Sequence, residues 1–107
     1  ARSASSEITK QIQITYIQAT IRYASKVNAD LAAGDSEKAR THQAEGWAFF
    51  RVIEPMIAGV DANVAATIDG IYNLSNEPSD SGATVLEALE SVYSELGITS
   101  DEVGTLS

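Results

Sequence analysis

A chain of 107 residues is long enough to form one domain with its own hydrophobic core, and it contains no cysteine for a disulfide or a thiolate metal site. Seven basic and fifteen acidic residues give a formal net charge of −8 at pH 7, which argues against partners such as nucleic acid or an anionic membrane. No stretch is apolar over the length that insertion into a membrane requires. The chain begins at Ala1 rather than at a methionine, which favours a processed product or an excised domain.

The first predicted helix runs from about residue 6 to residue 33 and stops at Gly34, a residue type common just after a helix end. Its apolar side chains cover well over half of the helix circumference, with Ile8, Ile12, Ile14, Tyr16, Ile17, Ala19, Ile21, Tyr23, Ala24, Val27 and Leu31. A helix that is apolar over so wide an arc is expected in the middle of a bundle.

The second predicted helix covers about residues 35–58, with Asp35 or Ser36 as its N-cap. Pro55 should end or bend it, because proline lacks the backbone donor and clashes with the preceding turn. At about 100° per residue, one stripe of this helix is expected to face the core. The stripe contains His42, Glu45, Phe49, Val52, Ile53 and Met56.

The third predicted helix covers residues 61–73, with Asp61 as its N-cap, and a turn-rich loop follows over residues 75–82. The fourth covers residues 81–96 and ends at Gly97. The inward side chains of these two helices are predicted to be Val64, Ala65, Ile68, Ile71, Tyr72, Val85, Leu86, Leu89, Val92, Tyr93 and Leu96. Residues 98–107 form either a further short helix from Ser100 or a frayed tail.

These elements predict an all-α fold. Short connections favour antiparallel neighbours, so we expect an antiparallel up-down four-helix bundle with a short extra C-terminal segment. One helical domain would span residues 1–107.

His42 and Glu45 are the candidate site, because a carboxylate on an apolar stripe is costly unless a partner or a metal ion pairs with it. Their i, i+3 spacing puts both side chains on one side of the helix. If the first two helices turn about Gly34, Tyr23 lies level with Glu45 and is the best third ligand. Weaker candidates are Glu54, Asp69 and Tyr72. Carboxylate, imidazole and phenolate donors together suit a hard transition metal such as ferric iron.

A metal-free interpretation stays open, in which Glu45 pairs with Arg22 or Lys26 and His42 hydrogen-bonds a tyrosine. Catalysis is not expected. Hydrolase motifs and a glycine-rich phosphate loop are absent, and redox catalysis at a di-metal site would need a second carboxylate cluster.

Other polar groups are interpreted as surface features. Arg51 and Glu54 are expected to form a surface ion pair, and Glu87, Glu90 and Glu95 a solvated helix face. Asn73-Leu74-Ser75 is a glycosylation sequon that would fit secretion.

The segment from His42 to Pro55, HQAEGWAFFRVIEP, resembles the core motif of the green-algal iron-assimilating proteins, also described as high-CO2-inducible periplasmic proteins. The segments 21–27 and 65–74 also look similar, so the resemblance covers about two thirds of the chain. A looser likeness is to imelysin-type iron-uptake bundles, whose motif is Gly-x-His-x-x-Glu, although Arg40 here replaces the glycine.

Both resemblances imply an extracytoplasmic protein, periplasmic or secreted, that binds ferric or ferrous iron without catalysis. They leave a second copy or a further domain of the same protein as candidate partners. The alternative is a metal-free helical interaction or spacer module of a larger secreted protein.

Overall fold

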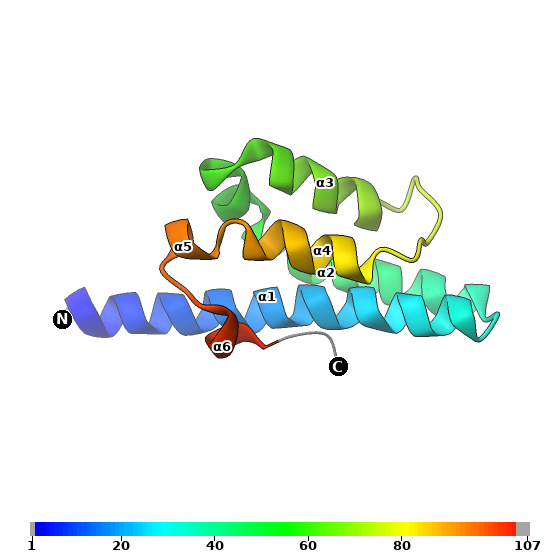
Figure 1. Ribbon diagram of the computed structural model, residues 1–107, viewed down its shortest axis with the longest axis horizontal. Coiled ribbons are helices and arrows are strands. Elements are labelled where there is room, and N and C mark those ends of the chain that lie inside the picture. Colours follow the sequence, from blue (N-terminus) through cyan, green and yellow to red (C-terminus); the bar gives the residue numbers. More distant parts are fainter. Residues whose placement is uncertain (1, 105–107) are drawn as a thin grey trace.

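The computed structural model describes residues 2–104, with side chains from Thr9 onward, and every regular element in this range is a helix (Figure 1). The all-α prediction is therefore confirmed for the described part of the chain. The helices are α1 (Arg2–Ala32), α2 (Ser36–Val60), α3 (Ala62–Tyr72), α4 (Gly82–Glu90), α5 (Tyr93–Leu96) and α6 (Ser100–Val103). None of them is both long and apolar enough to cross a membrane.

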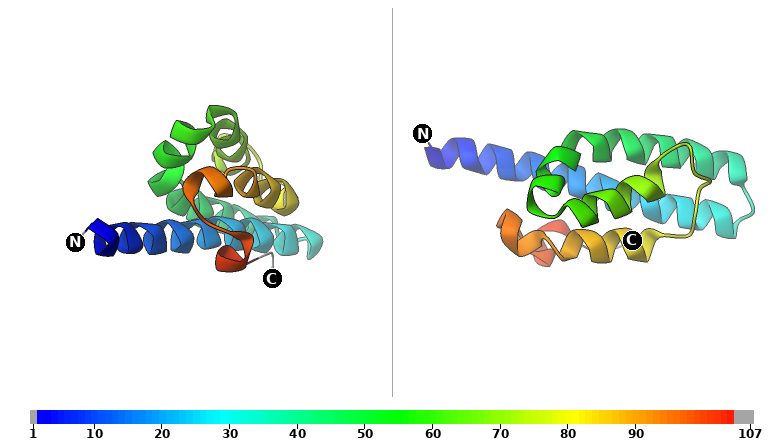
Figure 2. Two further views of the ribbon diagram at one scale, coloured as in Figure 1. Left: turned by 60° about the vertical axis from the view of Figure 1, so that its left-hand side comes forward. Right: turned by 90° about the horizontal axis from the view of Figure 1, so that it is seen from above.

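The two long helices α1 and α2 lie side by side and run in opposite directions, and they form the hairpin on which the rest of the molecule is built (Figures 1 and 2). The turn between them depends on Gly34, whose φ of 76° is the left-handed conformation that glycine adopts without strain. Asp35 then caps α2, and its side chain accepts a hydrogen bond from the backbone N–H of Lys38 at 3.0 Å.

Helices α3 and α4 lie on one side of this hairpin, α3 against α2 and α4 against α1 (Figure 2). Asp61 caps α3 as predicted, because its side chain accepts from the backbone N–H groups of Asn63 and Val64. At the start of α4, the backbone N–H of Gly82 donates to the side chain of Asn28 on α1 at 3.1 Å. This contact ties the loop of residues 73–81 back to the hairpin.

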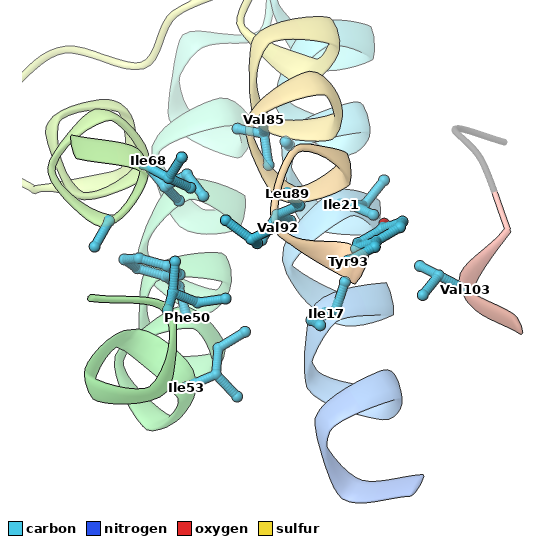
Figure 3. Close-up of a cluster of buried hydrophobic side chains, with 14 of the residues drawn as sticks. Ile17, Ile21, Phe50, Ile53, Ile68, Val85, Leu89, Val92, Tyr93 and Val103 are labelled. Atoms are coloured by element: carbon cyan, nitrogen blue, oxygen red, sulfur yellow. The ribbon is translucent and has the colours of Figure 1, made fainter. Parts of the chain in front are cut away.

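The core lies between the hairpin and the α3–α4 layer, where apolar side chains of all four helices meet (Figure 3). Its fully enclosed members include Ile17, Phe50, Ile57, Ile68, Tyr72, Val85, Leu89 and Val92. The inward residues predicted for the third and fourth helices are buried except Ile71, Leu86 and Leu96, which are half-buried.

The region predicted as one fourth helix over residues 81–96 is divided in the structure, because the chain breaks helical geometry at Ser91 and Val92. This break separates α5 from α4, and both Val92 and Tyr93 are buried. The predicted helix from Ser100 is present as α6, with Thr99 rather than Ser100 as its N-cap. Residues 105–107 of the predicted tail lie outside the described residues.

Two polar contacts hold α6 against α1. Lys10 and Glu102 form an ion pair at 2.9 Å, and the side chain of Gln18 donates to the carbonyl of Val103 at 3.0 Å. The hydrogen bond from Lys10 lowers the pKa of the Glu102 carboxyl below its ordinary value.

Of the end or bend predicted at Pro55, the end is wrong, because α2 continues through Pro55 to Val60. Proline removes only the hydrogen bond to the carbonyl one turn earlier, that of Arg51. Both Arg51 and Pro55 are exposed, so water can solvate the freed carbonyl. Burial of Ile53 and Ile57 on either side of the proline offsets the remaining cost.

Candidate metal site on the helical hairpin

The stripe predicted to face the core is rotated in the structure by about a quarter of the helix circumference. The residues of α2 that are buried are Ala39, Gln43, Gly46, Phe50, Ile53 and Ile57. Glu45 is exposed and Val52 is 58% exposed, whereas His42, Phe49 and Met56 are half-buried, the first two along the seam with α1. The prediction that Glu45 lies in the core is therefore wrong.

Gly46 explains this rotation. A side chain at position 46 would overlap the ring of Tyr72, and its Cβ would lie 2.8 Å from Cβ of Tyr23. Only glycine lets α1 and α3 approach α2 this closely, so the face that carries Gly46 turns inward. A hydrophobicity pattern does not register this effect, because glycine contributes no apolar side chain to a stripe.

His42 is held by Asp30, a residue at the end of α1 that the sequence analysis did not select. Nδ1 of His42 lies 2.5 Å from Oδ2 of Asp30, and their side chains are 17% and 11% exposed. A carboxylate at this distance accepts the hydrogen bond from Nδ1–H, so Nε2 is left with its lone pair when the ring is neutral. The pair fixes the ring's tautomer and limits its rotation.

Aromatic rings from both helices line the seam beside His42. The Tyr23 ring lies 5.8 Å from the His42 ring and stacks on Phe49 at 5.5 Å, and Phe49 also meets the edge of Tyr16 at 5.8 Å. The predicted turn about Gly34 therefore placed Tyr23 at the correct level of α2.

The weaker candidates lie elsewhere. Asp69 accepts a hydrogen bond from the indole N–H of Trp47 at 3.3 Å. The Tyr72 hydroxyl is buried and donates to the carbonyl of Thr20, and burial raises its pKa above the ordinary value. Glu54 is half-buried on the opposite side of α2 from Glu45. The site therefore gathers Tyr23, Asp30 and His42, with Glu45 one turn away.

The structure also shows where the polar groups predicted to lie on the surface are located. The guanidinium of Arg51 lies 5.0 Å from the centroid of the Trp47 ring, and no ion pair joins it to Glu54 within the described residues. Asn73 is at the end of α3, and its side-chain oxygen accepts from the backbone N–H and the hydroxyl of Ser75. Glu87, Glu90 and Glu95 are exposed, as expected.

A second polar centre, on the inner face of α2, was also missed. Gln43 is 1% exposed, and its Nε2 lies 3.1–3.3 Å from the carbonyl oxygens of Ile71, Asn73 and Asn76. Its Oε1 accepts from Arg40, which also donates to the carbonyls of Leu74 and Asn76. This network anchors the loop after α3, so its polar groups are already engaged in hydrogen bonds within the fold.

The donors near His42 are few. Within residues 9–104, no group of three or more His, Asp or Glu side chains is gathered closely enough to hold a metal ion. Imidazole, carboxylate and phenol groups, donor types that suit a hard metal ion, are present along this part of the hairpin in His42, Glu45 and Tyr23. No protein family model, curated protein or solved structure matches this chain.

Proposed function

We propose that this protein binds iron for assimilation outside the cytoplasm, through His42 and Glu45 with Tyr23 as the third ligand. The observation that supports this role is the hydrogen bond between Asp30 and Nδ1 of His42. Metal-binding histidines commonly donate their second ring N–H to a carboxylate, which fixes the tautomer and raises the basicity of the other nitrogen. The extracytoplasmic location rests on the resemblance of residues 42–55 to iron-assimilating proteins.

Each ligand has a separate role in this proposal. His42 supplies a neutral imidazole nitrogen that Asp30 orients. Glu45, one turn further along α2 and exposed to solvent, supplies a carboxylate without the cost of burying its charge. Tyr23 supplies an oxygen that becomes a strong ligand for ferric iron on losing its proton.

The scaffold in this proposal is an antiparallel up-down bundle of α1 to α4, which holds the ligand-bearing hairpin rigid. We propose a binding role and not catalysis. Glu45 is exposed and His42 and Tyr23 are half-buried outside the core, so that an ion could enter and leave without opening the core.

The experiment measures iron binding by the purified chain with ferrous and ferric iron, using metal analysis after desalting and thermal melting with and without the metal. Glu45→Gln and His42→Ala should each weaken binding at least tenfold while the metal-free fold persists. Tyr23→Phe should remove the visible phenolate-to-iron charge-transfer band. Glu87→Gln, on the solvated face of α4, is the matched control and should bind as the wild type does.

Asp30→Asn tests the orienting hydrogen bond. This variant should weaken iron binding less than His42→Ala does, because the imidazole remains while its orientation is lost. Wild-type protein that neither retains iron nor melts at a higher temperature with it would overturn the proposal. The second candidate function, a metal-free helical interaction module, would then be favoured by the exposure of Ile12 and Val52.

A further inference from the structure

The side of the α1–α2 hairpin that faces away from α3 and α4 carries both apolar groups and charges, and α6 packs beside it on α1, against Lys10 and Gln18 (Figure 1). We call it the outer face and define it by Ile12 and Lys26 on α1 and by Glu45 and Val52 on α2. Ile12 is 51% exposed and Val52 is 58% exposed, although both are large apolar side chains. Residues at intervals of seven fall on the same side of a helix. Glu45 and Val52 are seven apart, and Ile12 and Lys26 are fourteen apart.

We call the position of a residue along the axis of the hairpin its height. The heights of these residues follow from the close approach of Tyr23 and Gly46. Lys26 comes three residues after Tyr23, and Glu45 comes one residue before Gly46. Because the helices are antiparallel, Lys26 and Glu45 are both displaced toward the end of the hairpin that is closed by the turn at Gly34. At 1.5 Å per residue their heights differ by about 3 Å.

The apolar residues lie toward the other end. Phe49 packs between Tyr16 and Tyr23, so Val52, three residues further along α2, lies close to the height of Tyr16. Ile12 is one helical turn beyond Tyr16. The outer face therefore has a charged half, with Lys26 and Glu45, and an apolar half, with Ile12 and Val52.

Neither Lys26 nor Glu45 has an ion-pair partner among residues 9–104. Nζ of Lys26 instead lies 5.4 Å from the centroid of the Tyr23 ring. A lysine and a glutamate lie at one height on neighbouring helices. When two such faces are brought together with their helices exchanged, the lysine of each face meets the glutamate of the other.

We propose that the partner of the outer face is a second copy of this chain, related by a two-fold axis parallel to the helices. Such a rotation preserves heights and places α1 of each copy over α2 of the other. Lys26 then faces Glu45 of the partner copy, and the apolar half of each face covers the apolar half of the other. This local complementarity is what would allow two chains of net charge −8 to associate.

The outer face is small for a protein–protein interface. Two adjacent helices present a strip about 20 Å wide, and a contact about 30 Å long would bury roughly 600 Å² per copy. This is near the lower end of specific interfaces, so the dimer should form at protein concentrations of about 10–100 μM.

Sedimentation equilibrium of the wild-type chain at low salt, with a chelator present, tests the proposal. The chelator keeps the result independent of iron, so failure of iron binding would not affect it. Lys26→Glu and Glu45→Lys should each weaken dimerisation at least tenfold, because each places like charges together at both equivalent contacts. Val52→Ser should also weaken it, and Glu87→Lys is the charge-changing control away from the face.

The decisive experiment mixes the two charge-reversed variants. In a heterodimer of Lys26→Glu with Glu45→Lys, every facing pair again has opposite charges, so the mixture should dimerise near the wild-type concentration. An ion pair within one chain could not be restored by mixing. Circular dichroism of each variant verifies folding. A monomeric wild type at 100 μM, unchanged association of either variant, or a mixture that stays monomeric would overturn the proposal.

Discussion

The two faces of α2 differ in how completely their side chains are enclosed. On the inner face, Gly46 admits the ring of Tyr72, and Phe50 is 0% exposed and stacks beside that ring. On the seam with α1, Phe49 is only half-buried between two tyrosines. Phe49 and Phe50 are neighbours in sequence and identical in chemistry. The comparison shows that the approach of α3, which is possible because of Gly46, decides which ring becomes part of the core.

Replacing each phenylalanine with alanine tests this difference most directly. Phe50→Ala should lower the free energy of unfolding by about 3–5 kcal/mol, as truncations of fully enclosed rings do. Phe49→Ala should cost about 1–2 kcal/mol, because it loses two aromatic contacts and little enclosed area. Urea denaturation measures both changes. If both variants lost the same free energy of unfolding, the proposed difference in enclosure between the two faces would be contradicted.

The polar residues of the two faces offer a second, smaller test. Gln43→Leu should lower the free energy of unfolding by about 1–3 kcal/mol, because the part-buried carbonyl of Ile71 loses this donor and the carbonyl of Asn73 keeps only the backbone N–H of Asn76. Glu45→Leu, on the exposed side of the same helix, should change it by less than about 0.5 kcal/mol. Hydrogen exchange of residues 73–81 should increase in Gln43→Leu alone, and protection equal to wild type would contradict the anchoring role.

The smallest expected effect concerns two buried tyrosines. The Tyr93 hydroxyl is buried and has no hydrogen-bond partner among the described residues, whereas the Tyr72 hydroxyl bonds to Thr20. Tyr93→Phe should therefore leave stability unchanged or raise it by up to about 1 kcal/mol at pH 7, and Tyr72→Phe should lower it by a similar amount.

The pH dependence sharpens this last comparison. Burial, followed by the charge of Glu90, raises the pKa of Tyr93 from 10.0 to about 12. A raised pKa means that the folded state favours the protonated hydroxyl, so this contribution to stability is complete below pH 10 and is lost between pH 10 and about 12. Tyr93→Phe should reduce the fall in unfolding free energy measured over that range. A fall as steep as that of wild type would contradict the assignment.

Local sequence signals predicted much of the fold. Gly34, Asp35 and Asp61 mark helix ends through backbone conformation and side-chain hydrogen bonds, which depend on a few adjacent residues, and all three are confirmed. Pro55 is the exception. Its local penalty is outweighed by burial of neighbouring side chains, which depends on the rest of the fold.

The candidate site was only partly predictable. The antiparallel turn at Gly34 placed Tyr23 correctly, because a tight turn fixes the heights of two helices. Asp30, twelve residues from His42, could have been found from the same turn, since both lie near the closed end of the hairpin. Gln43 could have been found as a polar residue on the stripe of Ala39, Phe50 and Ile57.

The sequence by itself determined where the helices lie and how the first two pair, because capping, chain reversal and apolar content act over short distances. Only the tertiary structure decided which side of α2 became the core. That choice depends on the close contact of Gly46 with Tyr23 and Tyr72, three residues that are far apart in the chain. The inward turn of the Gly46 face placed Glu45 at the surface and His42 at the seam beside Asp30. Close contact between helices stabilises the fold more than burial of the longest apolar stripe of α2 would.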